Sequence, residues 1–196
     1  MNVEKALRAL RENGFEARWF ATAAEAADAL CAELKGKTIG IGGSVTVEQM
    51  GLGDRLSREN TVCWHWQQPS AEARKNAMAA EVYLLSANAV SETGALVNID
   101  GTGNRVAAIC YGPSTVYLAV GRNKIVSGGY QEAMRRIKEV ACPQNARRLG
   151  LDTPCASGHC NVSECTRSMC NIILTLEHAP GAKTTKVVLI NEDLGY

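Results

Sequence analysis

The spacing of apolar residues changes along the chain, and the changes predict alternating helices and strands. Val3, Leu7 and Leu10 recur at the interval of a helix face. A second helix is expected where Thr22 and Glu25 form a capping box. Strands, most of them near-continuous apolar runs of the kind found in parallel sheets, are expected at 15–20, 38–41, 61–66, 82–86, 116–120 and 186–191.

Helices are expected between these strands, including one that Ser70 caps and one from about Tyr130 to Val140 that ends before Pro143. Strands that alternate with helices predict an α/β fold with a mainly parallel sheet and flanking helices. No convincing linker divides the chain before about residue 143. We therefore expect one domain over 1–196, with an α/β core at 1–143 and a cysteine-rich segment and closing strand at 144–196.

Composition and charge exclude several partners. The 196 residues suffice for a full core, and 21 basic against 20 acidic side chains predict no large surface for nucleic acid. No stretch has the length of a transmembrane helix, and the first residues form a charged amphipathic helix rather than a secretory signal. We expect a cytoplasmic protein with reduced cysteines and no membrane partner. The oligomeric state stays open, and a homo-oligomer is one alternative.

Half of the cysteines follow a constant C-x4-C-x4-C-x4-C spacing near the C-terminus: Cys155, Cys160, Cys165 and Cys170. Four thiolates this close can surround one metal centre. An iron–sulfur cluster such as [4Fe–4S] requires cysteine ligands, whereas a structural zinc accepts the same set but usually with tighter pairs. Disulfides, redox-switching dithiols and inert buried thiols are the alternatives. In a reducing compartment the metal is favoured.

The other cysteines have a plainer interpretation. Cys31 lies on an apolar helix face, and Cys63 and Cys110 lie in strand-like runs, so these three are expected in the core. Cys142 is ambiguous, because it precedes Pro143 at the expected helix exit and could lie near the cluster.

Three polar or glycine-rich segments follow expected strands, and ligands of open α/β sheets bind at the carboxyl ends of strands. The first segment contains Gly42, Gly43 and Ser44. Its glycines let the backbone approach a ligand, and the helix that follows presents free N–H groups to an anion. The segment is neither a Walker loop nor a complete dinucleotide fingerprint, and an ordinary tight turn is the alternative.

The second segment, 86–94, contains Asn88, Glu92, Thr93 and Gly94. Glu92 is its ionisable residue. At a strand end a carboxylate can act as a base, as a nucleophile or as a ligand for a hydroxyl group. A solvated loop glutamate is the alternative.

The third segment combines glycines, amides and an arginine: Asn98, Gly101, Gly103, Asn104 and Arg105. A backbone nest beside a fork-shaped guanidinium suits a carboxylate or a phosphate. Lys124 follows the next strand and could add a point charge to the same pocket. A turn with surface charges is the alternative for each residue alone, but together the three segments predict a pocket for a small anionic substrate.

The histidines are interpreted as packing or spare groups. Trp64, His65 and Trp66 alternate at strand spacing, which predicts half-buried packing rather than a site. His159 lies inside the cysteine run and is a spare candidate ligand.

The residues of these segments also carry a family resemblance. The run SANAVSETGALVNIDGTGNRVA (86–107), Tyr111-Gly-Pro and 120–126 resemble the LUD-domain (lactate-utilisation) family, and the likeness continues through Ala133, 143–145, the cysteine run and 192–195. It covers essentially the whole chain. The resemblance implies a Rossmann-like fold similar to NagB, ribose-phosphate isomerase (RpiA) and CoA transferases. Ligands of that wider group are phosphosugars, acyl groups or CoA, and an acidic residue often performs the chemistry, which implies that role for Glu92.

The resemblance leaves three functions open. Family members are linked to lactate oxidation with iron–sulfur oxidoreductase subunits, but this chain lacks the C-x2-C-x2-C-x3-C-P runs of those subunits. It could be an iron–sulfur accessory or redox subunit that binds a 2-hydroxy or 2-oxo acid, with Arg105 on the carboxylate. It could instead be a non-redox isomerase or acyl transferase with a structural metal, or a ligand-binding regulatory module. If the cysteine loop reaches the pocket, the metal centre can take part in the function. If it does not, the centre is structural.

Overall fold

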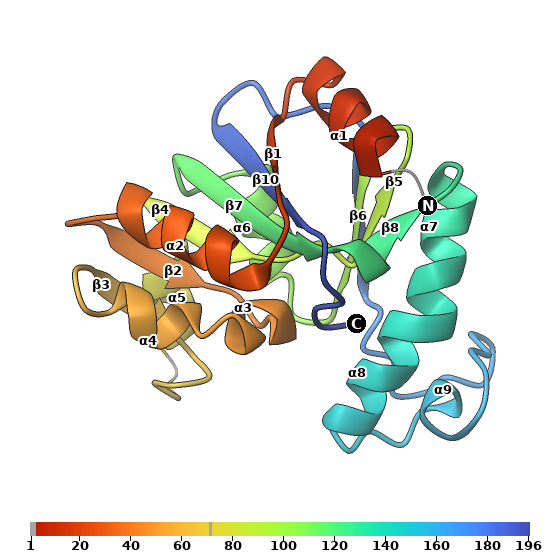
Figure 1. Ribbon diagram of the computed structural model, residues 1–196. Helices are drawn as coiled ribbons and strands as arrows, with labels where there is room; N and C mark the ends of the chain where they lie inside the picture. The colour runs from red at the N-terminus through yellow and green to blue at the C-terminus, as the bar shows by residue number, and fades with distance from the viewer. Residues whose placement is uncertain (1–2, 71) are drawn as a thin grey trace.

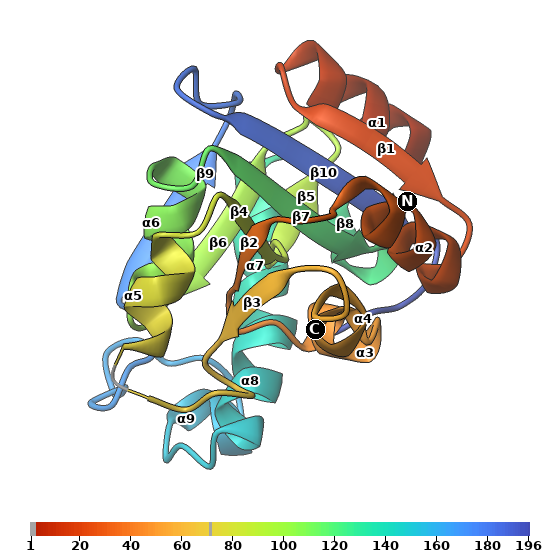
Figure 2. The same cartoon turned by 90° about the vertical axis from the view of Figure 1, so that its left-hand side faces the viewer.

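The computed structural model describes residues 3–70 and 72–196 (Figure 1). In this described part of the chain, six strands form the main sheet in the order β1-β10-β7-β4-β2-β3, and every neighbouring pair is parallel (Figure 2). The strands are β1 (Glu16–Phe20), β2 (Thr38–Ile41), β3 (Thr61–Trp64), β4 (Val82–Leu85), β7 (Thr115–Gly121) and β10 (Thr184–Ile190). The predicted α/β fold with a mainly parallel sheet is confirmed.

A second sheet lies beside the first. The described residues form it from four short strands in the order β8-β5-β6-β9, namely β8 (Ile125–Val126), β5 (Ala89–Ser91), β6 (Leu96–Asp100) and β9 (Ile172–Leu176). β6 pairs antiparallel with β5 and β9, while β8 pairs parallel with β5. The segments at 86–94 and 98–105, expected as loops after strands, therefore include the strands of a hairpin. The turn that joins β5 to β6 lies at one end of the second sheet, and the residues before β5 and after β6 lie at the other end.

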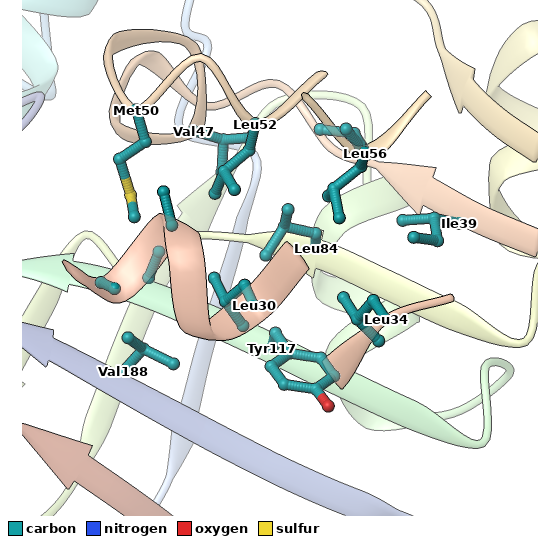
Figure 3. Packing of buried hydrophobic residues seen from close by; sticks show 14 of the residues in the cluster. Leu30, Leu34, Ile39, Val47, Met50, Leu52, Leu56, Leu84, Tyr117 and Val188 are labelled. Carbon is teal, nitrogen blue, oxygen red and sulfur yellow. The ribbon is translucent and has the colours of Figure 1, made fainter. Parts of the chain in front are cut away.

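Helices cover both faces of the main sheet. One face packs against α2 (Ala23–Glu33), α3 (Val45–Gln49) and α4 (Leu52–Leu56), where Leu30, Leu56 and Leu84 are buried together (Figure 3). The predicted cap of α2 is present, since the Thr22 side chain accepts the Glu25 N–H. The other face packs against α1 (Val3–Glu12), α5 (Ala73–Met78), α6 (Asn104–Cys110) and the second sheet. The first two residues of the expected N-terminal helix lie outside the described range.

A long helical rod covers the far face of the second sheet (Figure 1). It consists of α7 (Tyr130–Arg136), a π-helical turn η2 (Ile137–Ala141) and α8 (Cys142–Arg148). The expectation that a helix ends before Pro143 is wrong. Pro143 falls in the first turn of α8, where its missing N–H is tolerated because the π turn changes the hydrogen-bond register just before it.

The cysteine-rich segment follows this rod. It begins with α9 (Pro154–Ser157) and reaches β9 through turns. This short helix contains Cys155. Across the described ranges, no helix is both long enough and apolar enough to cross a membrane.

Candidate functional site

A cavity of about 280 Å³ lies at the carboxyl ends of the parallel strands. The segments that follow β2, β3, β4 and β7 contribute Ser44, Trp66, Asn88 and Lys124. The chain moves outward from β2 to β3 and then returns to the other side of β2 with β4. Ligands of open α/β sheets bind where the strand order reverses in this way.

Lys124, at the end of the 3-10 turn η1 (Arg122–Lys124), forms part of the cavity wall. It is only 3% exposed, and its Nζ donates to Thr46 Oγ1 (2.7 Å) and Ser86 Oγ (2.9 Å). Burial, and then the positive charges of Arg136 and Arg105, lower the pKa of Lys124 to about 7. Among residues 3–70 and 72–196, no carboxylate forms an ion pair with this amine.

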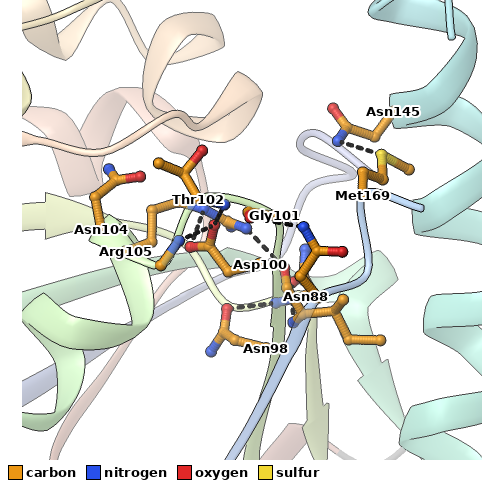
Figure 4. Close-up of polar contacts among 12 residues, drawn as sticks. Asn88, Asn98, Asp100, Gly101, Thr102, Asn104, Arg105, Asn145 and Met169 are labelled. Carbon is orange, nitrogen blue, oxygen red and sulfur yellow. Dashed lines mark hydrogen bonds and ion pairs between the residues drawn. The ribbon is translucent and has the colours of Figure 1, made fainter. Parts of the chain in front are cut away.

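Arg105 is held in place by the loop that precedes it (Figure 4). Its Nε lies 3.1 Å from Asp100 Oδ2, and its Nη2 donates to the Ile99 carbonyl at 2.7 Å. Asp100 Oδ1 in turn accepts the backbone N–H groups of Thr102 (3.0 Å) and Gly103 (3.1 Å). The expected backbone nest therefore binds the carboxylate of Asp100 instead of an external anion. Through this carboxylate the nest orients the Arg105 guanidinium.

Gly42 makes room for this arginine. A Cβ atom at position 42 would lie 3.0 Å from Arg105 Cγ and 3.1 Å from the Tyr83 ring. The Tyr83 hydroxyl is also close enough to accept a hydrogen bond from Asn104 Nδ2 (3.3 Å). The glycine thus serves the cavity indirectly, by allowing the close approach of α6.

The cavity lining also includes residues that the sequence did not single out. The Arg148 guanidinium lies 4.8 Å from the centroid of the Trp66 ring and donates to Asn145 Oδ1 (2.8 Å), and both side chains line the cavity. Arg74 lines it as well. Only the fold brings α5, α8 and the β3 loop together, so no local signal could have found this set.

His65 lines the cavity, contrary to the packing role expected for it. β3 ends at Trp64, so the strand alternation stops and the rings of Trp64 and Trp66 stack at 5.6 Å instead. Burial, followed by the charges of Arg74 and Arg105, lowers the pKa of His65.

Residues of α8 and of the cysteine-rich segment form another part of the cavity wall. Cys142, Met169 and Cys170 line the cavity, and the sulfur atoms of Cys142 and Cys170 lie 3.4 Å apart. The hydrogen bond from Cys142 lowers the pKa of the Cys170 thiol to about 6, with Lys138 adding to the effect. Cys142 and Cys155 are buried in one apolar cluster, and Cys160 packs against that cluster.

The thiols supply the right donor chemistry for a metal centre without being arranged around one. In the described part of the chain, no three Cys, His, Asp or Glu side chains are already grouped as a metal site. Burial raises the pKa of the Cys160 thiol, and the nearby thiols of Cys155, Cys170 and Cys165 add to this rise.

A family model described as the LUD domain matches residues 3–190. This chain belongs to the LUD-domain family. It is also similar to the crystal structure of a DUF162 family protein from Deinococcus radiodurans, with a TM-score of 0.56 and 14% sequence identity over 96% of this chain and 95% of that one. At this identity the likeness shows the shared fold alone. The comparison with curated proteins gives no match.

In this LUD domain, most of the sequence-predicted binding residues line the cavity: Gly43, Ser44, Asn88, Gly101, Asn104, Arg105 and Lys124. Gly42, Asn98 and Gly103 lie just behind the lining. The Asn98 side chain, for example, is buried and accepts the Asn88 N–H at 3.2 Å. These residues shape the site without facing it.

Glu92, Thr93 and Gly94 lie elsewhere in the LUD domain, at the turn of the β5–β6 hairpin. Glu92 forms an ion pair with Lys5 of α1 (3.1 Å), and that lysine together with the Gly128 N–H lowers its pKa. Asn13 donates to the Thr93 carbonyl at 3.0 Å. The hairpin reverses the chain, so Asn88 and Asp100 reach the cavity while Glu92 does not line it.

The cysteines outside the cluster match their expectations in part. Cys31 and Cys63 are half-buried and pack against the two main apolar clusters. Cys110 is exposed at the end of α6, so the expectation of a core strand residue is wrong. The apolar run around it is one face of a helix.

Proposed function

We propose that this LUD domain is an accessory or redox subunit for 2-hydroxy acids, which binds a small carboxylate in the cavity and an iron–sulfur cluster beside it. One observation carries the proposal. Cys142 and Cys170 line the same cavity as Arg105 and Lys124. The cysteine loop thus adjoins the anion pocket, and a metal centre there would act at short range.

The cavity supports a small anionic ligand. Its lining includes the guanidinium groups of Arg74, Arg105 and Arg148, the amine of Lys124 and the carboxylate of Asp100. A volume of about 280 Å³ suits a molecule the size of lactate or pyruvate better than a whole cofactor. Arg105 would bind the carboxylate, because Asp100 and the Ile99 carbonyl already fix its orientation.

The cysteine wall supports the metal. Cys155, Cys160, Cys165 and Cys170 supply the four thiolates that a [4Fe–4S] cluster requires, and the cluster when bound transfers single electrons. Cys142 is then a hydrogen-bond donor to the sulfur of Cys170 rather than a ligand. Hydrogen bonds to ligand sulfurs tune the reduction potential of such clusters.

The test is metal analysis of protein purified without oxygen. We expect about four iron and four sulfide per chain, with visible absorbance, and loss of both in Cys160→Ser and Cys165→Ser. Cys110→Ser, at an exposed thiol outside the cluster, is the matched control and should keep the metal. A colourless protein without iron or sulfide would contradict the proposal.

A structural zinc beside a site for phosphorylated or CoA-linked ligands is the second candidate, and the Cys142–Cys170 pair favours it. Two thiolates on one tetrahedral zinc, each at about 2.3 Å, are about 3.8 Å apart. The pair at 3.4 Å is already near that spacing, whereas the thiolates of a [4Fe–4S] cluster bind separate irons. This candidate predicts about one zinc, its loss in Cys142→Ser, and thermal stabilisation by phosphosugars or CoA esters but not by lactate.

A further inference from the structure

The amine of Lys124 is buried in the cavity wall with hydroxyl partners in place of a counterion. A buried ammonium without an anion is costly, and proteins normally pair it or leave it uncharged. The protonation state of Lys124 can therefore be inferred from the number of hydrogen bonds that its neighbours accept from it.

The neighbours of Lys124 match a neutral amine. The hydroxyl of Thr46 donates to the Leu194 carbonyl (3.1 Å), and that of Ser86 donates to the Ala87 carbonyl (3.2 Å). Each oxygen can then only accept from Lys124 Nζ. A neutral amine has two N–H donors and one lone pair, so these two acceptors satisfy it completely and leave the lone pair free.

The surrounding chain packs tightly against the amine away from the cavity. A Cβ atom at Gly195 would lie 3.1 Å from Lys124 Nζ and 2.6 Å from Thr46 Oγ1. Asn123 Nδ2 donates to the Gly195 carbonyl at 3.0 Å, which holds this segment in place. Lys124 itself lines the cavity, so the cavity is where the lone pair can meet a ligand.

We propose that Lys124 captures 2-oxo acids covalently, as an iminium formed with their carbonyl carbon. The ligand class rests on the function proposed above. The lone pair of Nζ adds to the carbonyl carbon, and one Nζ proton moves to the carbonyl oxygen to give a carbinolamine. The hydroxyl group then takes up a proton from solvent and leaves as water. This leaves a carbon–nitrogen double bond in the protonated iminium, with the ligand carboxylate on Arg105. The step needs no oxidant and no further reactant.

The lowered pKa supports this chemistry. Burial and the neighbouring cations Arg136 and Arg105 lower the pKa of Lys124 to about 7, so a large fraction is neutral at physiological pH. Lysines that form Schiff bases are activated in this way, by an apolar setting or an adjacent cation.

The experiment is reductive trapping in the full chain with pyruvate or glyoxylate as probe. Cyanoborohydride transfers hydride to the iminium carbon and leaves a stable secondary amine. We expect one adduct per chain by intact mass, located at Lys124 by peptide mapping, and none in Lys124→Met. Lys183→Met is the matched control and should trap normally. Burial also lowers the pKa of Lys183, but this residue does not line the cavity.

Ligand binding measured without reductant separates the two proposals. Stabilisation or calorimetric binding by pyruvate without an adduct at Lys124 would overturn the covalent capture and leave the anion pocket standing. Adducts confined to other lysines would overturn it as well. If pyruvate neither binds nor is trapped, the result would contradict the anion pocket itself and the covalent capture with it. Because peptide mapping uses the wild-type chain, the outcome does not depend on whether Lys124→Met folds.

Discussion

Two lysines at opposite ends of the main sheet are held in opposite ways. Near the amino ends of the strands, Lys186 of β10 donates to Glu33 at 2.6 Å and lies over the Tyr117 ring. Burial alone would lower its pKa, but the hydrogen bonds with Glu33 and Tyr117 raise it above the ordinary value. At the carboxyl ends, Lys124 has hydroxyl partners and a pKa lowered to about 7. The first lysine is a paired charge that supports the fold, and the second is an amine available to a ligand.

The largest effect should come from removing the Lys124 amine. Between about pH 7 and the ordinary lysine pKa of 10.5, the unfolded chain binds a proton that the folded chain does not. The free energy of unfolding of the wild type should therefore rise with pH across this window by a few kcal/mol. In Lys124→Met this part of the rise should vanish, which denaturant titrations at pH 7 and pH 10 would reveal. Equal slopes in both proteins would mean that the lysine is charged in the folded state.

The paired end of the sheet is tested by Glu33→Gln. Burial raises the pKa of Glu33, but hydrogen bonds from Lys186, Tyr117 and Arg18 outweigh it and lower the pKa to about 2. The carboxylate thus stabilises the fold above pH 4.5, and the contribution is lost as pH falls toward 2. Since the side chain is partly exposed, we expect a loss of about 1–2 kcal/mol in urea unfolding at pH 7. Ligand binding in the cavity should stay unchanged. Weaker binding would show that the two ends of the main sheet are energetically coupled.

The role of Arg105 is sharpened by Arg105→Lys, which keeps the charge beside Asp100 but loses the planar fork. We expect carboxylate binding to weaken about 10-fold, the equivalent of one charge-assisted hydrogen bond. Isothermal titration with lactate and pyruvate measures this change. Unaltered affinity would place the carboxylate on another cation of the cavity.

The smallest effect is expected for Glu92→Gln. Because Glu92 pairs with Lys5 on α1 and does not line the cavity, ligand affinity should change by less than about 2-fold. The same titration checks this. A loss comparable to that of Arg105→Lys would instead support the catalytic role that the family resemblance implies.

The main sheet could be predicted because its signals are local. The apolar runs at 38–41 and 82–86, for example, contain β2 and β4. The second sheet could not, since β5 and β8 contain three and two residues and are stabilised by neighbours distant in sequence. The continuation of the helix through Pro143 depends on a π turn, which has no clear sequence pattern.

The site was predictable to the same degree. Ser44 and Lys124 follow strands of the main sheet, and the rule that ligands bind at carboxyl ends places them in the cavity. Glu92 was expected there too, but the unrecognised hairpin carries it to the other end. Arg74 and Arg148 were missed because they lie on helices, and the residues around them carry no binding motif.

The position of β10 in the main sheet has a consequence for how the chain is made. This strand pairs with β1 on one side and β7 on the other, so residues 16–20 bond to residues 186–190. During synthesis β1 and α2 leave the ribosome long before residues 184–190, so the sheet stays incomplete until β10 has emerged. Chains shortened before residue 184 would lose the strand that joins β1 to β7, and they would expose strand edges prone to aggregation.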